Sequence, residues 1–235
     1  MEYIPGGDLE GYLLKHGRME ESLVKDVTRQ VLRGIKYIHE RDICHRNLKP
    51  GNILVVTEDP MIVKIGGFGQ AERVREGTFL KTFCGTLFYL APEGFPRYHM
   101  GAAPVSAGSK RKHDALEPEN PKPHGGYNQA MDLWSIGCLT FVLLTGRPPF
   151  DARHVGDILS TIMTEKFDVE ALWKAGVGSE RCVDFLSSLL KVDPSLRMKE
   201  DAALCHPWLA QDGKDDDGLG GDAGDAGKKC VLALR

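Results

Sequence analysis

Two short stretches decide how this sequence is read: CHRNLKPGN at residues 44–52 and KIGGFG at residues 64–69. The first stretch is a polar run that contains a proline and a glycine, which favours a loop. Apolar runs at residues 53–56 and 61–65 predict two short strands, joined by a turn at residues 57–60. The two stretches therefore flank a small β-hairpin.

The rest of the sequence has mainly helical patterning. Valines and isoleucines at spacings of three or four between residues 24 and 38 form one apolar stripe, which predicts an amphipathic helix. Asp8 precedes a short helical segment and is placed to cap its first turn. Residues 1–4 are expected to end a strand, with a turn at residues 5–7. Predicted helices cover residues 9–15, 20–40, 129–145, 155–164, 169–175, 179–191 and 199–204.

Length and composition predict one large domain, over residues 1–209, followed by a tail. The chain has 235 residues, of which 42% are hydrophobic and 27% charged, as in an ordinary globular protein. Residues 96–127 are rich in proline, glycine and charge without apolar periodicity, so we expect a mobile insertion there. Residues 210–235 are rich in aspartate and glycine and are expected to form a disordered acidic tail.

Charge, cysteine content and hydropathy limit the classes of partner and compartment. A formal net charge of -3 gives no broad electrostatic surface for nucleic acid or for a membrane, so neither is expected as a partner. The 6 cysteines are scattered without a C-x-x-C pair, which is typical of thiols in a reducing compartment. The apolar run at residues 136–144 is far shorter than the roughly 20 residues that span a bilayer. We therefore expect a cytoplasmic or nuclear protein.

Several motifs resemble, in the correct order, those of eukaryotic protein kinases. Residues 44–52 resemble the catalytic loop, H-R-D-L-K-x-x-N, and residues 67–69 resemble the magnesium-binding D-F-G motif. The other matches are MEY at 1–3 with the hinge, GGDL at 6–9 with the following turn, APE at 91–93, DLWSIG at 132–137 and HPWL at 206–209. An ordered series of this kind is far more specific than any one of its motifs.

The resemblance implies a mainly α fold, that of the C-terminal lobe of a protein kinase. The lobe would be a helical bundle with a small β-hairpin at the catalytic loop. The N-terminal lobe is expected to be absent, because the chain begins at the hinge and no glycine-rich phosphate loop precedes it. Lys49 and the C-terminal helices favour the serine/threonine branch, in particular the calmodulin-dependent and checkpoint-type kinases.

Two positions of the resembling active site lack the group that the family uses. Asn47 stands at the position of the catalytic aspartate, and its amide has no basic site comparable to a carboxylate. Gly67 stands at the position of the magnesium-binding aspartate and offers no ligand atom. Lys49, for the transferred phosphate, and Asn52, for the metal ion, are retained. We therefore expect weak or no phosphotransfer.

The resemblance also assigns roles to the remaining site residues. On the nucleotide side it implies Glu2, Asp8 and Leu54. Structural roles are implied for His45, Arg46, Phe68, Glu93, Asp132 and Arg197, and Arg197 is expected to pair with Glu93. With both carboxylates missing, no cofactor is expected to bind to this chain.

Two functions remain open. The first is a pseudokinase fragment that acts by binding proteins, in which Leu54, Ile65 and Phe68 would lie partly bare on the face that normally meets the N-lobe. The alternative is an ATP-dependent serine/threonine kinase that uses ATP and magnesium and whose N-lobe is missing from the gene model. In both cases a protein is the expected partner or substrate. An enzyme of unrelated chemistry finds no support in the motifs.

Overall fold

The apolar stripe between residues 24 and 38 lies on a long helix, as the sequence predicts. The computed structural model describes residues 3–73, 87–95, 127–150, 157–164 and 166–210. Its α-helices are α1 (Leu9–His16), α2 (Glu21–His39), α3 (Tyr127–Thr145), α4 (Ile158–Ile162), α5 (Val169–Lys174), α6 (Glu180–Leu189) and α7 (Glu200–Leu204). Its strands are β1 (Ile43–Cys44), β2 (Ile53–Glu58), β3 (Met61–Ile65) and β4 (Glu72–Arg73). Short 3₁₀ turns are η1 (Pro50–Asn52), η2 (Phe68–Gln70), η3 (Leu87–Tyr89), η4 (Pro92–Gly94) and η7 (Pro194–Leu196).

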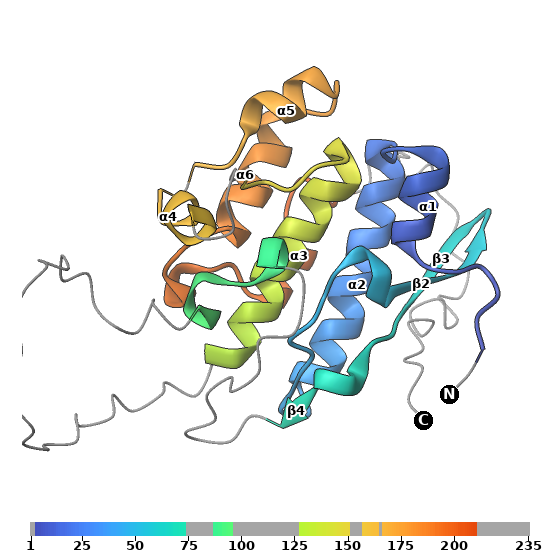
Figure 1. Ribbon diagram of the computed structural model, residues 1–235, viewed down its shortest axis with the longest axis horizontal. Coiled ribbons are helices and arrows are strands. Elements are labelled where there is room, and N and C mark those ends of the chain that lie inside the picture. The colour runs from blue at the N-terminus through green and yellow to red at the C-terminus, as the bar shows by residue number, and fades with distance from the viewer. Residues whose placement is uncertain (1–2, 74–86, 96–126, 151–156, 165, 211–235) are drawn as a thin grey trace, which may run out of the picture.

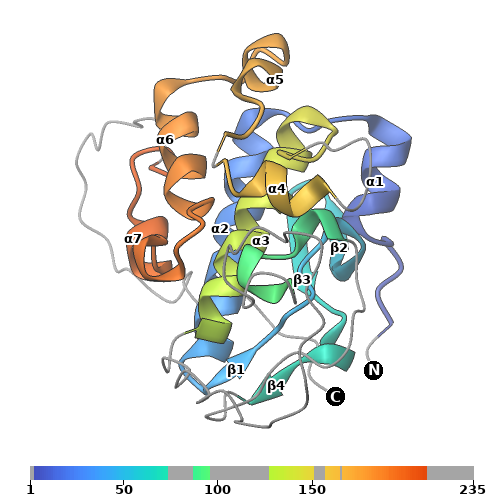
Figure 2. The same cartoon turned by 60° about the vertical axis from the view of Figure 1, so that its left-hand side comes forward.

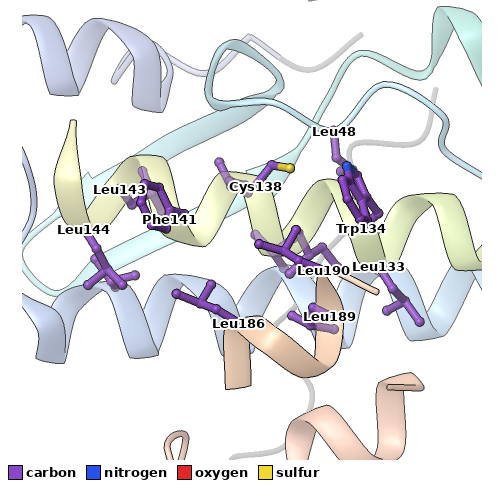
Figure 3. Packing of buried hydrophobic residues seen from close by; sticks show 14 of the residues in the cluster. Leu48, Leu133, Trp134, Cys138, Phe141, Leu143, Leu144, Leu186, Leu189 and Leu190 are labelled. Carbon is purple, nitrogen blue, oxygen red and sulfur yellow. The ribbon is translucent and has the colours of Figure 1, made fainter. Parts of the chain in front are cut away.

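Helix α3 lies in the middle of the helical bundle, with α2 on one side and α6 on another (Figure 1). Every residue of α3 from Met131 to Leu144 is buried, and the segment is apolar on all sides except for Asp132, Ser135 and Thr140. A Cβ atom on Gly137 would come within 2.9 Å of Leu190, so glycine allows α3 and the end of α6 to approach closely. Figure 3 shows Leu186, Leu189 and Leu190 packed against this helix.

Helix α2 connects the bundle to the β-hairpin. Its apolar stripe is buried against α3, α7 and β3. The hydroxyls of Thr28 on α2 and Thr140 on α3 lie 3.2 Å apart in the interior. The side chain of Gln30 reaches β3, where its Nε2 donates to the carbonyl oxygen of Met61 and its Oε1 accepts from the amide of Val63, both at 3.0 Å. The two hydrogen bonds of Gln30 fix the position of β3 along the axis of α2.

Two antiparallel strand pairs flank the sequence stretches at residues 44–52 and 64–69. Strands β2 and β3 form the predicted hairpin, with Ile53 opposite Ile65. The sequence did not predict the second pair, in which β1 lies beside β4 with Ile43 opposite Arg73 (Figure 2). The pairing of β1 with β4 brings the start of the 44–52 stretch next to the segment that follows the 64–69 stretch.

The N-terminal segment differs from the prediction. Tyr3 and Ile4 form no strand, and Tyr3 is 86% exposed, because no described segment lies beside them as a partner strand. The chain first meets the hairpin a few residues later, where the amide of Val55 donates to the carbonyl of Gly7 at 2.9 Å. The predicted cap is present, since Oδ1 of Asp8 accepts from the amide of Gly11 at 2.9 Å.

Some predictions fall largely outside the described residues. The insertion at residues 96–127 is described only at residue 127, and the tail at residues 210–235 only at residue 210, so both stay predictions. The same holds for the domain limits and for residues 155 and 156 of the predicted helix at residues 155–164. Of its described residues, 157–164, helix α4 covers Ile158–Ile162. Within the described ranges, no helix combines the length and the apolar character needed to cross a bilayer.

Candidate functional site

Asp132, in the second turn of α3, holds the backbone of the 44–52 loop. Its Oδ2 accepts from the amide of His45 and its Oδ1 from the amide of Arg46, both at 2.8 Å, and its side chain is completely buried. Arg46 has a φ of 66°, in the left-handed region that is unfavourable for a residue with a side chain. The two hydrogen bonds to Asp132 therefore stabilise a loop conformation that the chain would not adopt by itself.

His39 joins the same aspartate to a third helix. Its Nε2 donates to Oδ2 of Asp132 at 2.8 Å, and its Nδ1 donates to Oε1 of Glu200 at the start of α7. Burial alone would lower the pKa of His39, but the hydrogen bonds to Asp132 and Glu200 outweigh it and raise this pKa to about 9. A protonated His39 therefore connects the ends of α2, α3 and α7 beneath the loop. Sequence reasoning missed His39 and Glu200, although His39 ends the apolar stripe of α2 four residues after Ile35.

The atoms of His39, Cys44 and Asp132 lie close enough to suggest a metal centre. Among the described residues, these three offer ligand atoms within 4.8 Å of one another, all buried. However, the Cys44 thiol donates to Oδ2 of Asp132 at 3.3 Å, and burial raises its pKa well above the usual value. A metal ion would need the thiolate and would displace the hydrogen bonds that hold the loop. Hydrogen bonding explains this cluster fully.

His45 ties the two sequence stretches together. Its Nε2 donates to the carbonyl oxygen of Gly66 at 2.7 Å, and its Nδ1 accepts from the amide of Asn47 at 3.3 Å. Burial lowers the pKa of His45, so the ring is neutral and both nitrogens suit these roles. The ring also meets Phe68 edge-on, with centroids 4.9 Å apart. The two residues lie where the resemblance implies structural roles for them.

Asn47, Asn52 and Gly67 come together where these stretches meet. Nδ2 of Asn52 donates to the carbonyl oxygen of Asn47 at 2.6 Å. Gly67 has a φ of 76°, and a Cβ atom there would lie only 2.4 Å from Cγ and Oδ1 of Asn52 and 2.7 Å from its Nδ2. The Asn52 carboxamide therefore fills the space where a side chain of residue 67 would begin.

This arrangement does not fit a magnesium ion. Magnesium takes hard oxygen ligands in near-octahedral geometry and is usually held by carboxylates. The site offers the neutral amide of Asn52, whose Nδ2 is already bonded to the loop, and Gly67 contributes no ligand. Asn47 replaces the one remaining family carboxylate with a second neutral amide. Within the described stretches at residues 44–52 and 64–69, no side chain carries a negative charge.

On the predicted nucleotide side, the described residues have structural contacts. Asp8 uses its carboxylate to cap α1 and pairs through its backbone with Leu54, which is half-buried. Glu2 lies outside the described residues. The prediction that Ile65 would be partly bare is wrong: it is 2% exposed, because its strand turns this side chain into the core. Phe68, three residues later, is half-buried, as expected for that face.

Lys49 lies immediately before η1 and is half-buried. A Cβ atom on Gly51 would come within 2.7 Å of Oε2 of Glu10 and 4.0 Å of Cε of Lys49. The carboxylate of Glu10, from α1, therefore lies over the loop near the stem of Lys49. Sequence reasoning missed Glu10, since nothing in the local pattern indicates that α1 leans on this loop.

Glu93 and Arg197 form the ion pair that the sequence predicts. Nη1 and Nη2 of Arg197 donate to the two carboxylate oxygens of Glu93 at 2.6 and 2.8 Å. Arg197 also donates from Nη1 to the carbonyl of Ala130 at 2.7 Å and from Nε to that of Lys191 at 2.8 Å. Its guanidinium carbon lies 5.2 Å from the ring centre of Trp134. The pair anchors η4 to the start of α3.

Comparison with known proteins matches this geometry to one family. The family described as "Protein kinase domain" matches residues 1–106 and 117–209. Serine/threonine-protein kinase RAD53 of Saccharomyces cerevisiae is 38% identical over 209 residues, which are 89% of this chain and 24% of that protein. Serine/threonine-protein kinase cds1 of Schizosaccharomyces pombe is 34% identical over 210 residues, 89% of this chain and 40% of that protein. The chain thus spans well under half the length of these two relatives.

Solved structures show the same similarity in three dimensions. The crystal structure of Rad53 residues 1–466 in complex with AMP-PNP superposes with a TM-score of 0.69 at 36% identity, covering 89% of this chain and 46% of that one. The crystal structure of the Rad53 kinase domain and SCD2 with AMPPNP gives the same TM-score at 34% identity, covering 67% of that chain. The arrangement of helices and hairpin is therefore that of checkpoint-type serine/threonine kinases.

Proposed function

Because the chain belongs to the protein kinase family, we propose that it is a pseudokinase, a catalytically impaired kinase domain that acts by binding or regulating other proteins. The observation that supports this most is the arrangement of Asn47, Asn52 and Gly67. Both positions at which the family places a catalytic carboxylate carry none, and a neutral amide fills the space at Gly67. The kinase scaffold around these positions is retained.

The physical argument concerns charge. Phosphoryl transfer depends on magnesium held by acidic and amide oxygens, and on an aspartate that accepts the substrate hydroxyl. An amide at position 47 cannot accept a proton, and general-base assistance is typically worth about 10²–10⁴-fold in rate. A glycine at position 67 removes a metal ligand and its charge, and electrostatic stabilisation is usually the largest contribution to catalysis. The two changes together remove most of the expected rate acceleration.

A phosphotransfer assay with the purified chain tests the proposal. With ATP, magnesium and a serine/threonine peptide mixture, we expect no phosphate incorporation above that of a Lys49→Ala variant. Lys49→Ala serves as the control, because activity from a contaminating kinase would persist in it. The proposal would be wrong if the chain incorporated phosphate at the rate of an ordinary serine/threonine kinase and the Lys49→Ala variant did not.

Nucleotide binding is a separate test. If the site holds neither cofactor, ATP with magnesium should leave the melting temperature unchanged, since a ligand that binds only the folded state raises it. Restoring the general base with Asn47→Asp should raise phosphotransfer from its baseline. A large stabilisation of the unmodified chain by ATP and magnesium would instead support the alternative.

The alternative is an ATP-dependent serine/threonine kinase that uses ATP and magnesium. Lys49 and Asn52 favour it, because both retain the family's residues, and the related Rad53 structure was determined with AMP-PNP. Asn47 speaks against it, because an amide has no basic site that could accept the proton of the substrate hydroxyl. For either function we propose a protein as partner or substrate, no role in binding nucleic acid or membranes, and a cytoplasmic or nuclear location.

A further inference from the structure

We propose that Asn52 acts as a structural wedge: its carboxamide binds the 44–52 loop and takes the space of any side chain at position 67, so that the two positions are coupled. In the family the residues at both positions bind a metal ion. In this chain the side chain of Asn52 would instead pack against Gly67. The coupling goes beyond the proposed function, because it rests on packing and hydrogen bonding and holds whether or not the chain transfers phosphate.

The backbone of Asn52 is fixed on both sides. Its amide donates to the carbonyl of Lys49 at 2.9 Å, closing the turn η1. Its carbonyl accepts from the amide of Gly66 at 2.8 Å, at the end of β3. With these two bonds in place, the Cα of Asn52 cannot move away from Gly67 without breaking the start of the hairpin. Only rotation of the side chain remains as a way to clear space.

Rotation of that side chain is itself opposed. Nδ2 of Asn52 donates to the carbonyl of Asn47 at 2.6 Å, and the side chain is half-buried between the two stretches. A rotation that frees the space over Gly67 breaks this hydrogen bond and leaves a carbonyl of the loop without its donor. The 2.4 Å approach to a Cβ at position 67 is far inside the 3.5–4.0 Å at which carbon atoms normally pack.

The wedge has a consequence for restoring the metal site. An aspartate at position 67 begins with the same Cβ atom as an alanine, so its carboxylate is excluded until Asn52 moves. In the family, the residues at positions 52 and 67 are both metal ligands. Here the Asn52 amide, which would be one ligand, occupies the space of the carboxylate that would be the other. A carboxylate placed at position 67 alone is therefore expected to strain the loop before it can bind a cation.

Thermal unfolding of the full chain tests the coupling with two glycine controls. Gly146 has the same φ of 76° but no atom within 4 Å of an added Cβ, so Gly146→Ala measures the left-handed strain alone. Gly69 also has open space and no positive φ, so Gly69→Ala measures the substitution without either effect. We expect Gly146→Ala to lower the melting temperature by about 2–8 °C. Gly67→Ala should lower it by about twice as much or more.

The decisive comparison is the same substitution with Asn52 removed. In an Asn52→Ala background, Gly67→Ala should lower the melting temperature only as much as Gly146→Ala does, because the wedge is gone. Equal effects of Gly67→Ala in both backgrounds would overturn the proposal. If Gly67→Ala does not fold, the comparison uses two double variants. Asn52→Ala with Gly67→Ala should fold and have the same melting temperature as Asn52→Ala with Gly146→Ala. A lower melting temperature or a failure to fold would also overturn the proposal.

A magnesium titration of Gly67→Asp gives an independent readout. We expect no rise in melting temperature with magnesium for this variant, because Asn52 still occupies the space in front of the new carboxylate. A magnesium-dependent rise in Gly67→Asp that is absent from the unmodified chain would show that Asn52 moves aside freely, and the wedge would be disproved. The pseudokinase proposal depends on phosphotransfer assays instead, so the two ideas can fail separately.

Discussion

Arg197 contacts Glu93 through two parallel hydrogen bonds, at 2.6 and 2.8 Å, and neither side chain is exposed to solvent. Two charges buried in this way are stable only together, because each is desolvated and relies on the other. The remaining donors of Arg197 reach backbone carbonyls, including that of Val192 at 3.2 Å. The pair therefore connects three segments that are far apart in the sequence.

Glu93→Gln should reduce the free energy of unfolding by about 3–5 kcal/mol, because it leaves the guanidinium of Arg197 buried without a counter-charge. Urea unfolding followed by circular dichroism measures the change. The matched control is Lys174→Met, which removes an exposed pair with Glu170 at 3.0 Å and should change stability by less than about 1 kcal/mol. Equal effects of the two substitutions would contradict the prediction.

The stability of the chain should fall as the pH rises from about 6.5 to about 9, because the unfolded chain releases the proton of His39 near pH 6.5 and the folded chain only near pH 9. The raised pKa means that the folded state binds this proton more tightly than the unfolded state does. The contribution is thus complete below pH 6.5 and lost above pH 9, and its size is on the order of 3 kcal/mol. Unfolding by urea at a series of pH values measures this loss.

His39→Gln is the control for that pH dependence. The variant keeps a polar side chain but cannot be protonated, so its stability should change little between pH 6.5 and 9. Burial alone would raise the pKa values of Asp132 and Glu200, but the hydrogen bonds to His39 outweigh it and lower both values. The stability that these two carboxylates contribute is therefore lost only at acidic pH, outside the range of this test. A wild-type chain that loses no more stability than His39→Gln over this interval would contradict the assignment.

Asp132→Asn should loosen the 44–52 loop without unfolding the bundle. The variant weakens the hydrogen bonds from the amides of His45 and Arg46, each of which is strengthened by the charge on Asp132. With about 1.5–3 kcal/mol for a bond to a charged group, these amides should exchange with solvent roughly 10–100 times faster. The amide of Val63, bonded to Gln30, serves as internal control and should be unaffected.

The buried hydroxyl pair of Thr28 and Thr140 should behave as one unit. Either substitution to valine leaves the other hydroxyl without its partner and should lower stability by about 1–3 kcal/mol. The double variant replaces both hydroxyls by methyl groups of similar shape and should be clearly more stable than the sum of the two losses predicts. Strict additivity of the three free energies of unfolding would show that the hydroxyls do not interact.

The elements that sequence periodicity governs were predicted closely. The apolar stripe at spacings of three and four gave residues 20–40 as a helix, and α2 covers Glu21–His39. The predicted strands at 53–56 and 61–65 are confirmed as β2 and β3, although β2 extends to Glu58 because the turn is tighter than expected. Such patterns persist in the fold because each buries one face against α3 or α2.

Features that depend on distant contacts could not be predicted in the same way. Strands β1 and β4 have two residues each and no pattern of their own, so only the fold brings them together. Sequence reasoning identified Asp132 by resemblance but not its connection through His39 to Glu200, which requires three helix ends to converge. The loss of a ligand at Gly67 was predictable, whereas its filling by Asn52 depends on side-chain geometry. The absence of an N-lobe stays a prediction.

The contact between Gln30 and β3 has a consequence for how this chain behaves in a crowded solution. A hairpin of two strands leaves each outer edge with backbone groups that another extended chain can pair with, which is a route to aggregation. On β3, the carbonyl of Met61 and the amide of Val63 are already engaged by one side chain that mimics a neighbouring strand. A single glutamine thereby occupies two backbone groups of β3 that could otherwise pair with another extended chain.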